Sequence, residues 1–104
     1  VPAERIALAR GNVLFWYEDP VTAIPLLESA AKAYLSLDPN SAQLAWVRLG
    51  QCLDMAGRRE DARRAFTQAA ALKPSSDLTR TARRHINQPF TLADKRKMDL
   101  PPPA

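Results

Sequence analysis

The most reactive side chains in this sequence are its only cysteine, Cys52, and its only histidine, His85. A metal centre or a general base needs further imidazole or carboxylate groups nearby, whereas two arginines precede His85. A single cysteine forms neither an intrachain disulfide nor a cysteine-based zinc cluster. Three glycines are also too few for a glycine-rich phosphate loop. We therefore expect no catalytic residue, no metal and no cofactor, and the sequence predicts that the protein is not an enzyme.

The basic residues are the second group of side chains that could carry a function. The net charge is +4, and residues 53–104 carry eleven Lys or Arg against six Asp or Glu. Seven of these basic residues form two clusters, Arg58, Arg59, Arg63 and Arg64 and then Lys95, Arg96 and Lys97. Such charge suits an acidic partner, including nucleic acid. However, acidic residues at 54, 60 and 61 lie within helical reach, and no aromatic residues are interleaved to stack on bases. We therefore predict a solvated, partly paired basic face and do not expect nucleic-acid binding.

Helices must position these side chains. Of the 104 residues, 46% are hydrophobic, and the abundant Ala, Leu, Arg and Gln favour helix. Between Leu44 and Met55 apolar residues recur every three or four positions, which predicts a helix of about four turns. Pro39 disfavours the continuation of a preceding helix, and Asn40 or Ser41 can cap the new one.

The next segment predicts a second helix that packs antiparallel on the first. Gly57 can adopt the left-handed conformation that ends a helix, and the apolar period resumes from Glu60 to Leu72. Because the link is short, the two helices must lie side by side. Gly50 leaves room for close approach, and we expect Trp46 and Phe66 to meet there.

The spacing of apolar and small residues in this pair has a known counterpart. It is carried by Trp46, Leu49, Gly50, Leu53, Gly57, Ala62, Phe66, Ala69 and Pro74. These residues resemble the tetratricopeptide repeat, of which residues 43–76 span one unit, with Leu53 where the family often has tyrosine. An unrelated helical hairpin with the same spacing is the alternative. The resemblance implies a helix-turn-helix unit that binds other proteins and has no catalytic role.

Residues 4–37 carry a fainter copy of the same repeat, which extends to about residue 40. The matching residues are Gly11, Leu14, Ala23, Leu27 and Ala30, at the separations of Gly50, Leu53, Ala62, Phe66 and Ala69. Asp19 followed by Pro20 predicts a cap and a first helical residue. Pro25 falls inside this helix and predicts a kink or a later start near Ile24.

A last helix is predicted over residues 77–87, after a capping sequence at residues 75–77. Its apolar stripe is narrow, so it packs on one side only and ends the array. The resulting fold is all-α, a right-handed α-solenoid of antiparallel pairs with repeats at about 4–40 and 43–76, in a domain of residues 1–88. The composition of residues 89–104, with mixed charges and prolines, predicts a mostly disordered tail in which Phe90 and Leu92 rest on the helices.

The family resemblance also implies where a partner binds. The first helix of each pair lines a concave face, which places there Leu8, Asn12, Phe15, Leu44, Val47, Gln51 and Asp54, with Thr81 and His85 extending it. The apolar members would bury a partner's anchor residues, and the amides would hydrogen-bond an extended peptide. The alternative is that several of these residues merely complete the core. Only Asn12 fits the scheme by which some family members hold chaperone tails, so that activity is not predicted.

A second candidate interface lies on the N-terminal side. Ile6 and Val13 occupy the positions that Ala45 and Cys52 use to face a preceding repeat, and this leaves an apolar stripe without a neighbour. It would pack on upstream repeats of a parent chain, on a second copy or on a partner protein. The alternative function is therefore a C-terminal accessory or oligomerisation domain of a larger enzyme, secretion or assembly protein.

The remaining expectations concern the partner and the compartment. We predict a protein or peptide partner. No segment is apolar for the roughly 18 residues that a membrane-spanning helix needs. The chain opens with Val1 and Pro2, which favours a processed chain or a piece of a longer one. The sequence does not identify the compartment; a soluble protein of the cytoplasm, or of the periplasm in a bacterium, fits it.

Overall fold

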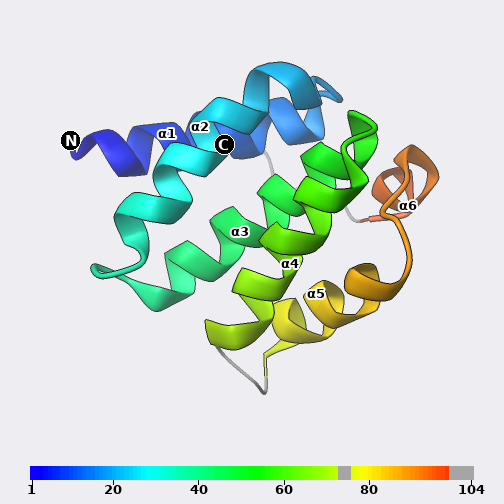
Figure 1. The fold of residues 1–104 in the computed structure, drawn as a ribbon. Coiled ribbons are helices and arrows are strands. Elements are labelled where there is room, and N and C mark those ends of the chain that lie inside the picture. Colours follow the sequence, from blue (N-terminus) through cyan, green and yellow to red (C-terminus); the bar gives the residue numbers. More distant parts are fainter. Residues whose placement is uncertain (73–75, 99–104) are drawn as a thin grey trace.

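The computed structural model describes residues 1–72 and 76–98, which form six helices and no strand. The helices are α1 (Ala3–Trp16), α2 (Pro20–Tyr34), α3 (Pro39–Met55), α4 (Arg59–Leu72), α5 (Asp77–Asn87) and α6 (Leu92–Arg96). Figure 1 shows them as a row that runs from α1 and α2 at the top, through α3 and α4, to α5 at the lower right. The predicted all-α architecture of stacked helix pairs is confirmed.

The helix starts follow from side-chain caps. The Asp19 carboxylate accepts the amide of Thr22, and Pro20 is the first residue of α2, as predicted. The helix runs on through Pro25, so the later start near Ile24 is wrong. For α3 the predicted caps were also misplaced. Asp38 is the cap and accepts the amide of Asn40 at 3.1 Å, because Pro39 already has the fixed φ of a first helical residue.

The two interhelical turns within the pairs share one geometry. Gly57 has φ +79°, and the amide of Arg58 donates to the carbonyl of Leu53 at 2.8 Å, which is the hydrogen-bond pattern of a Schellman motif. The amide of Asp19 donates in the same way to the carbonyl of Leu14 at 2.9 Å. In this first turn the left-handed residue is Glu18, with φ 61°. A glutamate thus stands where the second repeat has glycine.

Glycine brings the helices of each pair close together. A Cβ on Gly50 would lie 2.7 Å from the ring of Phe66, and a Cβ on Gly11 would lie 2.7 Å from Leu27. The two contacts are 39 residues apart in both helices, so the fainter first repeat packs as the second does. Trp46 differs from the prediction. No ring contact with Phe66 is present among the described residues. Trp46 is partly buried and packs both on the alanines of α2 and on the main core cluster, to which Phe66 belongs.

Neighbouring pairs stack through α2 on α3 and through α4 on α5, while α3 also touches α1 and α5. A buried amide joins the last three helices of this stack. Gln43 Nε2 donates to the carbonyl of Ala69 at 3.0 Å and to Thr79 Oγ1 at 2.8 Å, and its Oε1 accepts from Ser76 Oγ at 2.9 Å. Every polar atom of this amide is therefore used in fixing α5, whose cap is Ser76 as predicted. Pro74 and Ser75, also named as helix-ending and capping residues, lie outside the described residues.

The segment after α5 differs from the expected disordered tail. Residues 89–98 fold back on the helices, Phe90 is buried, and α6 carries a capping box between Thr91 and Asp94. Figure 1 shows α6 at the right, on the side where α3 ends. A segment with few apolar residues can still be ordered when its aromatic ring and its charged groups make contacts with the rest of the fold. Residues 99–104 lie outside the described residues.

Candidate functional site

The helices α1, α3 and α5 present one face, here called the inner face, on which Phe15, Gln51, Asp54 and His85 lie. These four side chains and that of Val47 are buried. Leu8, Asn12, Leu44 and Thr81 are only partly buried. The residues expected to meet a partner are therefore of two kinds, a covered centre and a more open margin. A charged residue at Phe15 or Val47 would disrupt the core itself.

Phe90 covers the centre of the inner face. Its ring centroid lies 6.1 Å from that of Phe15 on α1 and 5.2 Å from that of His85 on α5. Its backbone amide donates to Asp54 Oδ2 on α3 at 2.9 Å. One residue thus contacts all three helices. The sequence suggested that Phe90 rests on the helices but not that it meets the predicted binding residues.

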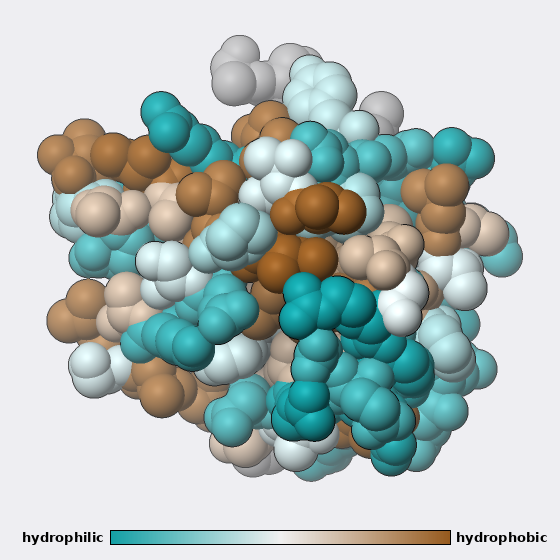
Figure 2. Space-filling model, turned by 45° about the horizontal axis from the view of Figure 1, so that its top comes forward, coloured by the Kyte–Doolittle hydropathy of each residue, from teal (hydrophilic) through white to brown (hydrophobic). Residues whose placement is uncertain are grey.

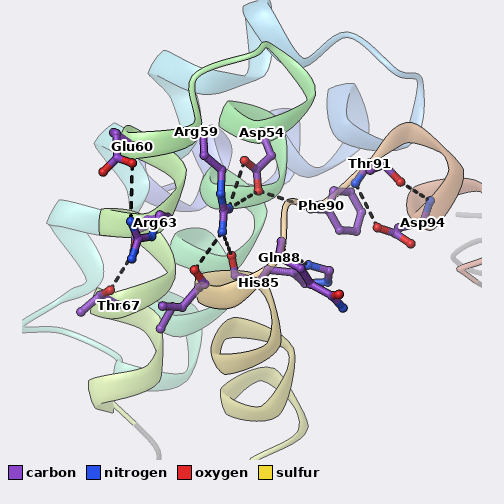
Figure 3. Close-up of polar contacts among 11 residues, drawn as sticks. Asp54, Arg59, Glu60, Arg63, Thr67, His85, Gln88, Phe90, Thr91 and Asp94 are labelled. Carbon is purple, nitrogen blue, oxygen red and sulfur yellow. Dashed lines mark hydrogen bonds and ion pairs between the residues drawn. The ribbon is translucent and has the colours of Figure 1, made fainter.

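A charge network beside Phe90 links the helices α3, α4 and α5. Arg59 Nη1 donates to both carboxylate oxygens of Asp54, at 3.2 and 2.9 Å, and the Asp54 side chain is only 1% exposed. Arg59 Nη2 donates to the carbonyls of His85 and Ile86 at the end of α5. Figure 3 shows Arg59 reaching between Asp54 and these carbonyls, with Phe90 on the other side of Asp54. The guanidinium therefore pairs with a buried charge and caps a helix C-terminus.

His85 is more buried than the sequence suggests. Its ring packs between Phe66, at 5.7 Å, and Phe90, and its Nδ1 lies 3.0 Å from the carbonyl oxygen of Gln88. Both sides of the imidazole are therefore in contact with aromatic rings. This arrangement suits a structural and positioning role at the inner face.

Residues 95 and 96 fix α6 through Glu18. Arg96 Nε and Nη2 each donate to the Glu18 carboxylate at 3.0 Å, and Lys95 Nζ lies 3.5 Å from it and 5.7 Å from the Trp16 ring centroid. The hydrogen bond from Arg96 lowers the pKa of Glu18 to about 2, with Lys95 adding to the effect. The carboxylate is therefore ionised at neutral pH. The conformation of Glu18 noted above directs this side chain at α6.

Arg48 on α3 reaches across the inner face to α1. It donates to Asn12 Oδ1 and to Gln51 Oε1, each at 2.9 Å, and its guanidinium sits 4.7 Å from the centroid of the Phe15 ring. Burial lowers its pKa to about 10, and it forms no ion pair within residues 1–72 and 76–98. The two polar residues predicted to bind a peptide backbone are thus engaged by this arginine.

A cavity of about 300 Å³ opens between the inner face and the returning segment. It is lined by Gln51, Thr81, Arg84, His85, Phe90, Asp94, Lys97 and Met98. Arg84 and Lys97 are exposed and make no ion pair with any described residue. Of the four margin residues, Thr81 is the one that lines this cavity. The cavity therefore combines an aromatic wall with charged side chains of both signs, since Asp94 also lines it.

The predicted basic stripe on α4 is paired, as expected. Arg58 and Arg64 both donate to Asp61, and Arg63 approaches Glu60 at 3.5 Å, a pair also visible in Figure 3. Together with the pair formed by Arg59, this leaves none of the four arginines without an acidic partner. The stripe offers little free charge to nucleic acid, and the absence of nucleic-acid binding stays a prediction.

The second candidate interface lies on the other side of α1. Ile6 is 40% and Val13 51% exposed, whereas their counterparts Ala45 and Cys52 are buried. Val13 also lines a shallow apolar pocket with Ala9, Arg10, Leu14 and Leu26. Figure 2 shows hydrophobic side chains in the upper part of the surface, where α1 and α2 come forward. Ile6 and Val13 therefore do not join the inner face but form a separate surface, here called the outer stripe.

Cys52 is the small buried residue that the sequence predicts. It has no exposed surface, and burial raises the pKa of its thiol to about 12. A thiol that stays protonated and has no access to solvent is a poor nucleophile. In the described part of the chain, no three His, Cys, Asp or Glu side chains come close enough to hold a metal ion. None of the described helices combines the length and apolar character of a membrane crossing.

Antiparallel helix pairs that repeat every 39 residues and share a glycine contact define an α-helical repeat domain of the solenoid class. Residues 43–76, which form most of α3 and α4, match the family model described as tetratricopeptide repeat, and this segment is such a repeat. Comparisons with curated proteins and with solved structures gave no match. Repeats of this family generally serve as non-catalytic protein-interaction modules.

Proposed function

We propose that this domain binds an extended segment of a partner protein at its inner face, across α1, α3 and α5. The observation that carries the proposal is that this face already holds an extended peptide, the chain's own residues 88–91. That peptide uses an aromatic ring, a backbone amide and a backbone carbonyl as its contacts. These are the contacts by which peptide grooves commonly combine affinity with specificity.

The margin of the inner face supplies the entry for such a partner. Thr81 lines the cavity beside Phe90, together with the charged residues Arg84, Asp94 and Lys97. An aromatic side chain of the partner would pack on His85. The predicted residues Leu8 and Leu44 are partly buried and would provide further apolar contacts to the partner.

Site-specific photo-crosslinking in the cells that make the protein tests this proposal. We expect a photoreactive residue at Thr81 to give discrete crosslinks to one or a few proteins. The same group at Gln68, exposed on α4, is the matched control and should give none of these products. Equal products from both positions, or none from Thr81, would contradict a partner site on the inner face.

A second candidate function is docking or self-association through the outer stripe. It is favoured by the burial of Ala45 and Cys52, because this face of α3 is covered whereas the same face of α1 has no neighbour within residues 1–72 and 76–98. An exposed apolar stripe of this kind commonly marks an interface.

Light scattering separates this candidate from the first. If copies associate through the outer stripe, the wild-type chain should exceed the monomer mass at high concentration, and Val13→Asp should return it to monomer by placing a charge in the contact. Leu37→Asp, which changes an exposed leucine in the turn after α2, should have no effect. A wild-type chain that is monomeric at every concentration would exclude self-association.

A further inference from the structure

We propose that residues 88–96 are a built-in ligand that occupies the inner face until a partner segment of the same chemistry replaces it. That chemistry is an aromatic residue in extended backbone, followed five and six residues later by basic side chains. The inference rests on the proposed function and names both the class of peptide bound and the way in which binding is regulated.

The aromatic anchor is the first element of this recognition. Phe90 is almost fully buried although it lies outside the helices, and its ring contacts Phe15 and His85. Edge-to-face packing against His85, with an interplanar angle of 86°, favours a flat ring over a branched aliphatic side chain at this place. The site therefore selects an aromatic residue.

The second element consists of two contacts to the peptide backbone, which do not depend on the identity of the side chains. Asp54 accepts the amide of Phe90, and the His85 ring nitrogen lies within hydrogen-bond distance of the Gln88 carbonyl. The contacts flank Pro89, which holds this stretch extended. Any peptide with an aromatic residue in extended conformation could present the same two groups.

The third element is the Glu18 carboxylate, which binds Arg96 and Lys95. Glu18 has a left-handed backbone, and this conformation is unfavourable for a residue with a side chain. Gly57 fills the equivalent position of the second repeat without that cost. The turn itself does not need the Glu18 side chain, since glycine adopts this conformation more easily. The side chain instead holds Lys95 and Arg96 against the end of α1.

The built-in segment has the properties of a replaceable ligand. Beyond Phe90 its main contacts are polar: Lys95 is buried beside Trp16 and Glu18, whereas Arg96 is 63% exposed. Helix α6 has only five residues, too few to be stable without these contacts. Being tethered directly to α5, the segment has a high effective concentration, on the order of millimolar or above. A competing peptide therefore binds weakly until the segment is released.

A labelled synthetic peptide with the sequence of residues 86–98 tests the proposal by fluorescence anisotropy. If the segment is docked in about 97% of molecules, it lowers the apparent affinity of a competitor about 30-fold. We therefore expect Phe90→Ala in the full chain to bind the peptide about 30-fold more tightly than the wild type. Ala93→Ser, which changes an exposed residue of the same segment outside the cavity, should resemble the wild type.

Two comparisons test the recognition elements. The peptide with alanine in place of its phenylalanine should bind the Phe90→Ala chain at least about 30-fold more weakly. Adding Glu18→Gly to Phe90→Ala should weaken binding of the unchanged peptide about tenfold, because charge-assisted hydrogen bonds are lost while the turn is kept. Equal binding to the wild-type and Phe90→Ala chains, or no preference for phenylalanine, would overturn the proposal.

Amide hydrogen exchange on the unmodified chain provides a test that needs no variant. Replacement requires the segment to detach while the helices stay folded, so the amides of Phe90 and Lys95 should exchange at least about 100-fold faster than buried amides of α3. Exchange of all these amides at one common rate would also overturn the proposal. Crosslinking at Thr81 without peptide binding would leave the proposed function standing and reject this inference alone.

Discussion

Gly50→Val is expected to destabilise the domain by about 3 kcal/mol or more, the result of forcing a branched side chain into the α3–α4 contact. A Cβ at this position would lie 2.7 Å from Phe66 Cε1 and 2.8 Å from Cδ1 and Cζ. The Phe66 ring has no exposed surface into which it could retreat. The small gain in helix propensity over glycine does not offset this clash. Urea denaturation followed by circular dichroism measures the loss as a lower midpoint.

A double-mutant cycle identifies the clash as the cause. Phe66→Ala alone should cost about 3–5 kcal/mol, because it leaves a cavity between the two helices. In the double variant the valine enters that space, so the combined loss should be smaller than the sum of the two single losses by at least about 1 kcal/mol. Additive losses would mean that the two side chains do not meet.

The helix pairs could be predicted from sequence because their signals are local. Gly50 and Phe66, or Gly11 and Leu27, belong to neighbouring helices whose periodicity and turn residues are visible within a short window. The cap of α3 was misplaced by two or three residues. Asp38, Asn40 and Ser41 all have side chains that can cap a helix, and only the structure shows that the Asp38 carboxylate is used.

The covered centre of the inner face could not be predicted in this way. Phe90 reaches Asp54 across 36 residues of chain, and nothing in the periodicity of α3 indicates that contact. One signal for α6 is nevertheless present in the sequence. Thr91 followed three residues later by Asp94 is the pattern of a capping box, and the structure contains both of its hydrogen bonds. Read together with Phe90, that pattern would have indicated an ordered segment in place of a disordered tail.

The sequence predicted the side of the array on which these residues lie better than it predicted their exposure. Family register places Phe15, Gln51 and His85 on one side of the array, and the structure brings all three around Phe90. Their burial depends on a segment outside the repeats and on Arg48, whose side chain takes up the polar groups of Asn12 and Gln51. A repeat pattern specifies which side of a helix faces inward, but not what lies on that side.

Asp54→Ala should be the second large effect, with a loss of about 3 kcal/mol. Breaking a buried ion pair by removing one partner costs about 3–5 kcal/mol, and the lower end applies because Arg59 is 28% exposed and keeps its bonds to the carbonyls of α5. The Phe90 amide also loses its acceptor. Denaturation at neutral pH measures the loss, and faster exchange of the Phe90 amide should accompany it.

The matched control is Asp61→Ala on the same pair of helices. Asp61 also accepts from two arginines, Arg58 and Arg64, but its side chain is 34% exposed and its partners are more so. Water and salt screen such pairs, so the loss should stay below about 1 kcal/mol. Asp61 has more arginine partners than Asp54 but is less buried. The comparison therefore shows whether the loss of stability depends on the number of ion pairs or on their burial. If both substitutions cost the same, the junction of α3, α4 and α5 does not depend on the buried carboxylate, and the anchoring of Phe90 must come from its ring alone.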